Sequence, residues 1–553
     1  MSETIAPLLA AKKAVIVSPP SPSPKEHQIG TAALAALIFF SVSGGPFGME
    51  EAVQSAGPLV TIVGLLVLPM LWSVPEALIT AECAPAFAEP SGSVAWVESA
   101  FGPFWGWMKG YLSWLSGVTD NALYPVLIAD YLTSFFHKEA ETIGVVDGLH
   151  RVLLLLGLTL VLTYLNWRGL DVVGTAAIVL MTLCMLPFVI MCIAALVQYN
   201  KLDGSRLGEL PEGGWGAVQW SSLLNILFWQ LNYWDSVATF AGDVKNPGKA
   251  FPRALAIAVA LVVLSTLVPL ATAVTGTRFA YTEYTDGFFG KVGSDLVGKW
   301  LGALIALAAA LSSVGMFEAE MASDAFSLMG LAERGHLPAF FAHRSRHGTP
   351  SAAIVCSACG ITFLASMSFL EIVQVLNFLY MLAMLIEFAA FVRLRVVLPC
   401  LPRPYRIPLG TWGICAMLSG PVMLLVCMLA MAPLKTWLIC GVAVLMGCGL
   451  YYVLHHPCTR RRCVFLQDPF ERRRDASTSS VLRVYGTDDL GYVLEYPSDW
   501  QFTISFRTGI GGPNYPNTFL QEKRSAMALH FRPKMCVKFQ RGYGTWSYIP
   551  RHV

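Results

Sequence analysis

Long apolar runs separated by short polar stretches occupy most of the chain between residues 29 and 454. An apolar helix needs about 20 residues to cross a bilayer. Twelve runs are long enough, at about 29–54, 57–83, 99–133, 149–165, 170–198, 217–242, 254–276, 298–328, 351–370, 372–397, 411–432 and 434–454. We therefore predict an all-α integral membrane protein with twelve transmembrane helices.

Two of the apolar runs are interrupted near their centres by residues that end a helix. The first run contains SVSGGPFGMEE (41–51), with glycines, a proline and two glutamates, and the sixth contains the polar and acidic centre of FWQLNYWDSVATFAGDV (228–244). Backbone groups exposed by a break must be satisfied by protein or by a watery cavity, so each break marks a candidate site. Breaks five spans apart predict two inverted five-helix repeats, about 29–198 and 217–397. For the first break, a kink without a ligand is the alternative.

Polar segments flank the predicted twelve-span domain at 29–455, which contains the two repeats and two further helices. Residues 1–28 include SPPSPSPKEH, which is typical of a disordered tail, and lack the apolar core of a signal peptide. Residues 456–553 contain stretches such as GYVLEYPSDWQFTISF that alternate as a strand does. Lysines and arginines gather on the side of both termini, so we expect both tails to be cytoplasmic.

Composition narrows the class of protein further. Hydrophobic residues make up 55% of the 553 residues, charged residues only 13%, and the mean hydropathy is +0.57, as in polytopic membrane proteins. The 13 cysteines show neither a disulfide framework nor zinc-type spacing, and a net charge of +2 gives no sign of a nucleic-acid partner. The histidines lie in tails and loops, so we expect no cofactor, no metal site and no enzyme activity.

Acidic residues greatly outnumber basic residues in the predicted spans. The acids in the spans or at their edges include Glu50, Glu51, Glu76, Glu82, Asp120, Asp235, Glu318, Glu320, Asp324 and Glu387. Lys109 is almost the only base at comparable depth. Burial of one ionised carboxylate costs about 3 kcal/mol on insertion scales, so this excess of one sign requires a cation. The ammonium groups of a substrate, or protons, would supply it.

The first break favours an amine over a carboxylate as its ligand. The candidate substrate-binding residues there are Ser43, Gly44, Gly45 and Glu50. A carboxylate is usually held by free N–H groups at the start of a half-helix, but Pro46 removes one such donor and Glu50 adds negative charge. Compensation of the helix dipole is the alternative role for Glu50, and the two interpretations are compatible.

The second break combines an acid with aromatic residues. Asp235 follows Tyr233 and Trp234, so an ammonium group could meet a carboxylate and an aromatic face together, with a cation–π contribution of up to about 2 kcal/mol. We interpret these three residues as substrate-binding, with a structural helix cap as the alternative. A buried carboxylate can also bind and release a proton, and Asp235 and Glu320 are the candidates for proton coupling. Bracing of the eighth span, together with Asp324, is the alternative for Glu320.

Two more helices supply candidate substrate-binding residues. These are Asp120, Asn121 and Tyr124 in the third span, and Tyr380 and Glu387 in the tenth. Asp120 lies one helical turn before Tyr124, and Tyr380 and Glu387 are seven residues apart, so the members of each pair share a helix face. The alternatives are a polar helix interface for the third-span group and pairing of Glu387 with a base such as Arg393.

Six separated motifs between residues 29 and 454 resemble one group of membrane transporters. They are SVSGGPFGMEEAVQSAGPL, LPMLWSVPEALITAE, WLSGVTDNALYPVL, FAGDVKNPGKAFPRAL, EMASDAFSLMGLAERGHLP and LIEFAAFVRLR. The chain resembles the amino acid–polyamine–organocation superfamily, most closely the polyamine-uptake transporters of plants and trypanosomatid protozoa. The resemblance implies a leucine-transporter-like core of five-plus-five inverted repeats with discontinuous helices 1 and 6.

The same resemblance implies a function. It implies a secondary active transporter that imports polyamines such as putrescine and spermidine by alternating access, coupled to protons, in the plasma membrane. Its partners would then be the polyamine, protons and the lipid bilayer, and protein partners stay open. Sodium is the alternative coupling ion, for which Ser312 and Ser313 of the eighth span would supply hydroxyl ligands. A cationic or neutral amino-acid transporter of the same fold, and a transporter-like nutrient sensor that signals through its C-terminal tail, are the alternatives.

Overall fold

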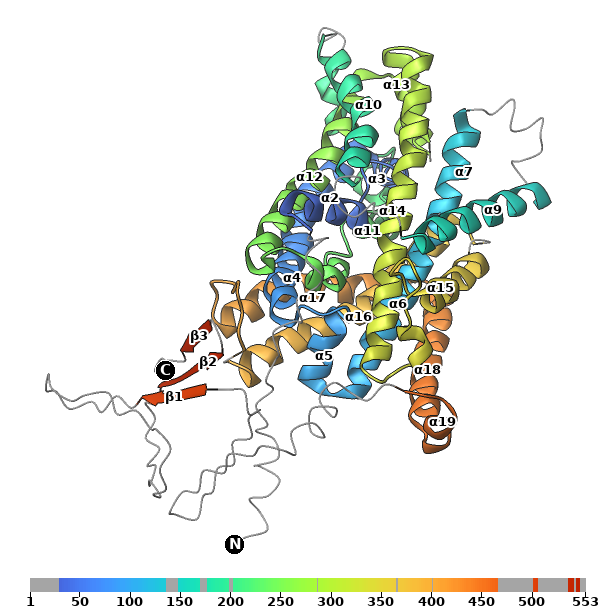
Figure 1. The fold of residues 1–553 in the computed structure, drawn as a ribbon. Coiled ribbons are helices and arrows are strands. Elements are labelled where there is room, and N and C mark those ends of the chain that lie inside the picture. The colour runs from blue at the N-terminus through green and yellow to red at the C-terminus, as the bar shows by residue number, and fades with distance from the viewer. Residues whose placement is uncertain are drawn as a thin grey trace, which may run out of the picture. The chain divides into compact units, whose positions relative to one another are not determined.

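The computed structural model of the chain divides into two compact units, residues 1–466 and 467–553. The described residues are 29–135, 148–169, 177–197, 202–285, 287–364, 367–399, 401–465, 501–505, 536–541 and 544–547. Our prediction of a disordered tail at 1–28 lies outside them. The described part of the first unit is built of helices, as predicted (Figure 1).

The described helices of the first unit follow one another in chain order. Up to residue 217 they are α2 (Thr31–Val42), α3 (Glu50–Leu68), the π-helical turn η1 (Pro69–Ser73), α4 (Val74–Phe87), α5 (Ser93–Phe101), α6 (Pro103–Asn121), α7 (Leu123–Phe135), α9 (Gly148–Trp167), α10 (Ala177–Val197), and the 3-10 turns η4 (Gly204–Gly208) and η5 (Gly214–Ala217). After it they are α11 (Trp220–Trp229), the 3-10 helix η6 (Ser236–Asp243), α12 (Pro247–Gly276), η7 (Tyr281–Glu283), α13 (Phe288–Leu296), α14 (Lys299–Glu333), η8 (Ala339–Ala342), α15 (Ser351–Leu364), α16 (Phe369–Val397), α17 (Thr411–Met431), α18 (Leu434–His455) and α19 (Pro457–Arg462).

Several helices are long and apolar enough to cross a membrane. Among the described residues there are eight such stretches: Glu50–Phe87, Gly148–Trp167, Ala177–Val197, Pro247–Gly276, Lys299–Glu333, Phe369–Val397, Thr411–Met431 and Leu434–His455. Thr31–Val42 and Ser351–Leu364 are shorter apolar helices. The chain is therefore an integral membrane protein, whereas the count of twelve spans and the inverted repeats stay predictions.

The predicted third span at 99–133 is not one uninterrupted helix. α5 ends at Phe101, Gly102 has a φ of 93°, and Pro103 begins α6. Proline is accepted at the first position of a helix but not in its interior, which explains the boundary. A second boundary at Ala122 separates α6 from α7.

The predicted break in the first span is present. α2 ends at Val42 and α3 begins at Glu50, and between them Gly44, Gly45 and Gly48 have φ values of 63°, 121° and 77°. Only glycine adopts such left-handed conformations without strain, so this segment cannot continue as a helix. The two glutamates of the motif occupy the first turn of α3, as the sequence indicates.

The predicted break in the sixth span is present as well. α11 ends at Trp229 and η6 begins at Ser236, with residues 230–235 unwound between them. Tyr233 in this segment has a φ of 65°, which is rare for a residue with a side chain. Such strain persists only where the surrounding contacts hold it, and it is concentrated at functional sites.

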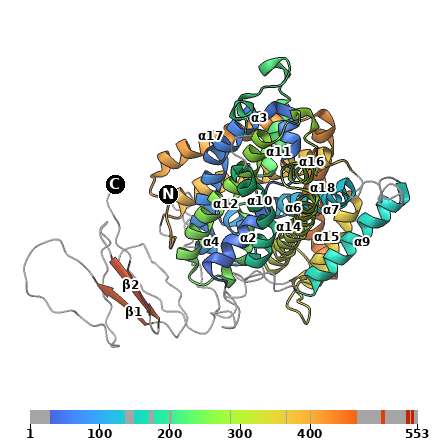
Figure 2. The ribbon, with the colours of Figure 1, turned by 90° about the horizontal axis from the view of Figure 1, so that it is seen from above.

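The two breaks lie among closely packed helices. α6 packs against α14 and α16, α12 packs against α2 and α4, and η6 packs against α14 and α4. α9 lies at the edge of this helical unit in both views (Figure 2). Segments that are far apart in the sequence therefore meet around η6.

The second unit contains a small antiparallel sheet in its described residues. Its strands β1 (Gln501–Ser505), β2 (Cys536–Arg541) and β3 (Gly544–Ser547) are arranged in the order β1-β2-β3. Phe502 pairs with Phe539, which pairs in turn with Trp546. β1 lies within the alternating stretch at 491–506, so a strand there was correctly predicted from the sequence.

Candidate functional site

A small cavity lies beside the second break, between η6 and α14. The described residues that line it are Ser91, Ser93, Ser113, Trp114, Tyr233, Asp235, Ser236, Thr239, Glu320, Ser323, Asp324, Ser327 and Tyr380. Seven of these carry aliphatic hydroxyl groups, three are carboxylates and three are aromatic, and none is a lysine or an arginine. The cavity volume is about 30 Å³, which is room for about two water molecules.

Asp235 of the second break is paired with a buried lysine. The ammonium nitrogen of Lys109, on α6, lies 3.1 Å from Oδ2 of Asp235 and 2.9 Å from Oε2 of Glu387, on α16. Lys109 and Glu387 are completely buried, and Asp235 is nearly so. Glu387 therefore pairs with Lys109 and not with Arg393, whose guanidinium group lies over the ring of Phe101. The lysine compensates charges that would be costly if they were buried alone.

Tyr380, on α16, connects the second break to α4. Its hydroxyl oxygen lies within hydrogen-bond distance of Oδ1 of Asp235, at 2.9 Å, and of Oε1 of Glu76. The same oxygen accepts a hydrogen bond from the backbone N–H of Tyr233, at 3.0 Å, while Glu76 accepts one from the backbone N–H of Trp234, at 2.9 Å. Glu76 and Tyr380 thus satisfy two of the N–H groups that the unwound segment exposes.

The two aromatic residues of the second break have different surroundings. The Tyr233 hydroxyl lies 2.6 Å from Oγ of Ser116, and its ring lies against that of Tyr380, with 4.5 Å between the centroids. The indole N–H of Trp234 donates to the carbonyl oxygen of Leu231, and Trp234 does not line the cavity. The aromatic side chain that contacts Asp235 is therefore Tyr380, through its hydroxyl group.

The α14 wall of the cavity carries two carboxylates that have no basic partner among the described residues. Glu320 and Asp324 lie one turn apart on α14 and both line the cavity. Asp324 accepts a hydrogen bond from Nδ2 of Asn121, at 3.3 Å, and lies close to the backbone of Gly117. Oε2 of Glu320 is buried and has no hydrogen-bond partner among the described residues. Among the described residues, Glu320 and Asp324 therefore lack a cationic partner such as the one that Lys109 provides for Asp235.

The remaining third-span candidates do not line the cavity. Oδ1 of Asp120 accepts a hydrogen bond from the indole N–H of Trp229, at 2.7 Å, and Oδ2 accepts one from the hydroxyl of Tyr124. Asp120 and Tyr124 are buried, and neither lines the cavity. Asn121 reaches the cavity indirectly, through its hydrogen bond to Asp324.

The candidates at the first break are joined to the second break but do not line the cavity. The side-chain amide of Gln230 donates to Oγ of Ser43, at 2.6 Å, and to the carbonyl oxygen of Gly45. The carbonyl oxygen of Gly44 accepts a hydrogen bond from Ser312, on α14. Glu50 accepts one from the hydroxyl of Tyr131, at 2.7 Å. The two breaks therefore lie side by side, while the cavity belongs to the second.

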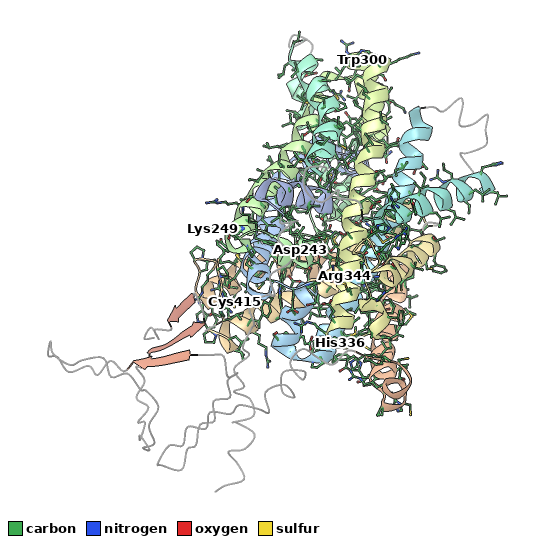
Figure 3. The ribbon with its side chains drawn as sticks, in the orientation of Figure 1. Asp243, Lys249, Trp300, His336, Arg344 and Cys415 are labelled. Atoms are coloured by element: carbon green, nitrogen blue, oxygen red, sulfur yellow. The ribbon has the colours of Figure 1, made fainter. Side chains whose placement is uncertain are left out.

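A cluster of charges lies at the end of the cavity marked by Ser91. The hydroxyl of Ser91 lines the cavity and accepts a hydrogen bond from Nε of Arg334, at 3.1 Å. Arg334 also pairs with Glu89 and Glu98, each at 2.7 Å, and His336 lies 3.3 Å from Glu98. Burial alone would raise the pKa of Glu98, but the hydrogen bond with His336 and the charge of Arg334 outweigh it and lower this pKa. Figure 3 shows His336 near one end of α14 and Trp300 at the other.

Three residues that hold the two breaks together had no assigned role in our sequence analysis. Lys109 and Glu76 were noted there only as charges in the spans, and Gln230 was not noted. The signal available for Lys109 was its position as an almost solitary base among many acids, because a buried base requires an acidic partner. Nothing in the local sequence distinguishes Glu76 from the other acids or identifies the partners of Gln230.

Comparison with known proteins identifies clear relatives. The profile of a family described as amino acid permease matches residues 29–448. A probable polyamine transporter of Arabidopsis thaliana is 48% identical over 438 residues, which cover 78% of this chain and 88% of that protein. Polyamine transporter PUT1 of Oryza sativa subsp. japonica is 48% identical over 450 residues, covering 81% and 82%. Polyamine transporter RMV1 of Arabidopsis thaliana is 47% identical over 428 residues, covering 77% and 84%.

Proposed function

The chain belongs to the amino acid permease family, and we propose that it is a transporter whose substrates are polyamines. Family membership makes it a transporter and not an enzyme. The observation that carries the choice of substrate is the cavity at the second break, which three carboxylates and no base line among the described residues. Such a site attracts ammonium groups and repels carboxylates. The names of the relatives support the same substrate class.

The hydrogen bonds of the two breaks argue against an amino acid as substrate. An amino-acid carboxylate is usually bound by free backbone N–H groups at broken helices. At the second break the N–H groups of Tyr233 and Trp234 already donate to Tyr380 and Glu76. At the first break the N–H of Gly48 donates to Tyr131. These three N–H groups are therefore not free to bind a carboxylate.

The proposed substrate-binding residues form two groups. In the first group, Asp235 and Glu387 contact the ammonium group of Lys109, and the hydroxyl of Tyr380 contacts Asp235 and accepts from the N–H of Tyr233. Of these four residues, all but Glu387 line the cavity. The other candidates, Ser43, Gly44, Gly45, Glu50, Asp120, Asn121, Tyr124 and Trp234, lie outside the cavity lining and would support the site by holding the two breaks and α14 in place.

Transport in this proposal proceeds by alternating access and is driven by protons. A cavity of about 30 Å³ holds only about two water molecules, so its walls must separate before a polyamine can enter or leave. Asp235 and Glu320 are the proposed proton sites, and the unpaired Glu320 is the stronger candidate because Asp235 already has Lys109 as its partner. We place both termini in the cytoplasm, because the basic loops lie on the side of the termini. The plasma membrane is proposed because the chain resembles uptake transporters.

Uptake of radiolabelled putrescine and spermidine into transporter-deficient cells tests this function. Wild type is compared with Asp235→Asn at acidic and at neutral external pH, with excess arginine as competitor. Asp295→Asn, at an exposed position of α13, is the control for changes in surface expression. We expect saturable uptake that is faster at acidic pH, lost in Asp235→Asn and unaffected by arginine. No polyamine uptake by well-expressed wild type, or full competition by arginine, would overturn the proposal.

A further inference from the structure

We propose that Glu320 and Asp324 form an ammonium-binding subsite, the α14 subsite, which takes the distal amine of a diamine whose first amine lies beside Asp235. This inference rests on the proposed polyamine function and deepens it, because it assigns the second positive charge of the substrate to named residues. It also gives Glu320 and Asp324 a role other than bracing α14.

The α14 subsite faces the second break across one cavity. Ser323, Asp324 and Ser327 lie three, four and seven residues after Glu320, so the four residues share one face of α14, and all of them line the cavity. Oγ of Ser323 donates to the backbone carbonyl oxygen of Ser236, at 3.1 Å, which fixes this face beside the start of η6. A chain molecule in an enlarged cavity would therefore contact Asp235 at one end and the α14 subsite at the other.

Charge distinguishes the two ends of the cavity. Asp235 has a cationic partner within the protein, the ammonium group of Lys109. Neither Glu320 nor Asp324 forms an ion pair in the part of the chain that the structure describes, and the donor to Asp324 is the neutral amide of Asn121. Oε2 of Glu320 is buried without a hydrogen-bond partner among the described residues. A buried acceptor without a partner is costly, so a ligand cation is favoured at this wall.

A primary ammonium group fits the donor and acceptor chemistry of the α14 subsite. It carries three N–H donors and no acceptor, like the side chain of lysine. The carboxylates of Glu320 and Asp324 and the hydroxyl of Ser327 provide acceptors for these donors on one helix face. Of the two carboxylates, one can accept the ammonium group while the other holds a proton, so the subsite is compatible with proton coupling.

The α14 subsite predicts which substrates are preferred. A diamine places a positive charge at both ends of the cavity, whereas a monoamine leaves the subsite without a cation. An amino acid would bring a carboxylate towards a wall of acidic residues that offers it no base among the described residues. Removal of one carboxylate from the subsite should therefore weaken the binding of diamines and leave the binding of monoamines unaffected.

Competition by a matched pair of amines tests the inference in the full-length protein. Putrescine and 1-aminobutane, which has the same carbon chain but one amine, compete against labelled spermidine in cells that express wild type, Glu320→Gln or Asp324→Asn. Because a charge-assisted hydrogen bond is lost, we expect putrescine to bind about tenfold more weakly in each variant, with 1-aminobutane changed by less than about twofold. The ratio of the inhibition constants of the two amines does not depend on the amount of folded protein.

Glu318→Gln is the matched control, because this acid of the same helix accepts a hydrogen bond from Asn166 and does not line the cavity. It should leave the ratio unchanged. Equal weakening of both amines in Glu320→Gln and Asp324→Asn would show a structural role, and an unchanged ratio with loss of the pH dependence would show a proton site only. Either result overturns the α14 subsite. If wild type takes up no labelled spermidine, the proposed function itself fails, which is a separate outcome.

Discussion

Lys109 places its ammonium nitrogen 3.1 Å from Oδ2 of Asp235, so the acid at the second break already has a cation beside it. The same nitrogen lies 2.9 Å from Glu387, and the hydroxyl of Tyr380 links Asp235 to Glu76. One lysine therefore lies among three acids at the centre of the proposed site. The group contains more acids than bases, which suits a cationic substrate without leaving every acid unpaired.

Replacement of Lys109 by methionine should destabilise the protein strongly. Removal of one partner of a buried ion pair typically costs about 3–5 kcal/mol, because the remaining charge is left unpaired. Lys109→Met should therefore lower the unfolding temperature of the purified protein in detergent. Lys109→Met combined with Glu387→Gln should be less destabilised than Lys109→Met alone, since one orphaned charge is removed. A double variant that is less stable than Lys109→Met would show that Lys109 does not compensate the charge of Glu387.

Removal of the Tyr380 hydroxyl should impair transport more than folding. Tyr380→Phe leaves the N–H of Tyr233 and two acids without this partner, and a buried unsatisfied group costs about 1–3 kcal/mol. We expect putrescine uptake per molecule at the cell surface to fall by about tenfold or more. Tyr452→Phe, on the exposed side of α18, is the matched control and should retain uptake. Equal uptake by Tyr380→Phe and Tyr452→Phe would remove Tyr380 from the site.

The first break should not tolerate a side chain at Gly44. Gly44 has a φ of 63°, and a Cβ atom there would lie 2.5 Å from Sδ of Met316 and 2.6 Å from Oγ of Ser312. Left-handed backbone costs about 1–2 kcal/mol for a residue with a Cβ atom, and overpacking adds about 1–3 kcal/mol. Gly44→Ala should therefore reduce the unfolding temperature, whereas Gly449→Ala, with no atom within 4 Å of its Cβ, should not. Equal unfolding temperatures would contradict the close packing of the break against α14.

The charge cluster around Arg334 should give stability that depends on pH. The pKa of Glu98 is lower in the folded protein than its ordinary value of 4.5. Such a group contributes stability that is fully present above its unfolded pKa and is lost as the pH falls through its folded pKa. The unfolding temperature of wild type should thus decrease below about pH 4.5, and part of this decrease should be absent in Glu98→Gln. Glu212→Gln, at an exposed loop position, should follow wild type; an identical acid dependence in Glu98→Gln would contradict the assignment.

Two truncations of the C-terminal tail test whether the tail is needed for transport or for the signalling that the nutrient-sensor alternative requires. Arg460 donates to the carbonyl oxygen of Gly335, and the backbone N–H of Ala339 donates to the carbonyl oxygen of Val464, at 2.7 Å. Deletion of 467–553 keeps these contacts, and we expect putrescine uptake within about twofold of wild type, because none of the proposed site is removed. Deletion of 456–553 removes the contacts and should lower the amount of folded protein at the cell surface. Loss of a cellular response with normal uptake after the shorter deletion would favour the nutrient-sensor alternative.

The sequence by itself determined the helical membrane class and the position of both breaks. Hydropathy, glycine and proline act locally, so the interruptions at 43–49 and 230–235 can be located without knowledge of the neighbouring helices. The spacing of Tyr380 and Glu387 likewise predicts that they share a face, and both join the network of Asp235. These features depend only on the chain near each residue.

Only the tertiary structure decided which acids have partners and which face the cavity. Lys109 meets Asp235 across 126 residues, and Tyr380 meets Glu76 across 304 residues. Whether Glu320 or Glu50 reaches the cavity depends on the rotation of each helix and on the helices packed against it, and helical periodicity does not specify these. Pairing of charges is a property of the assembled helices, so the contrast between a compensated Asp235 and an uncompensated Glu320 arises from packing between distant segments.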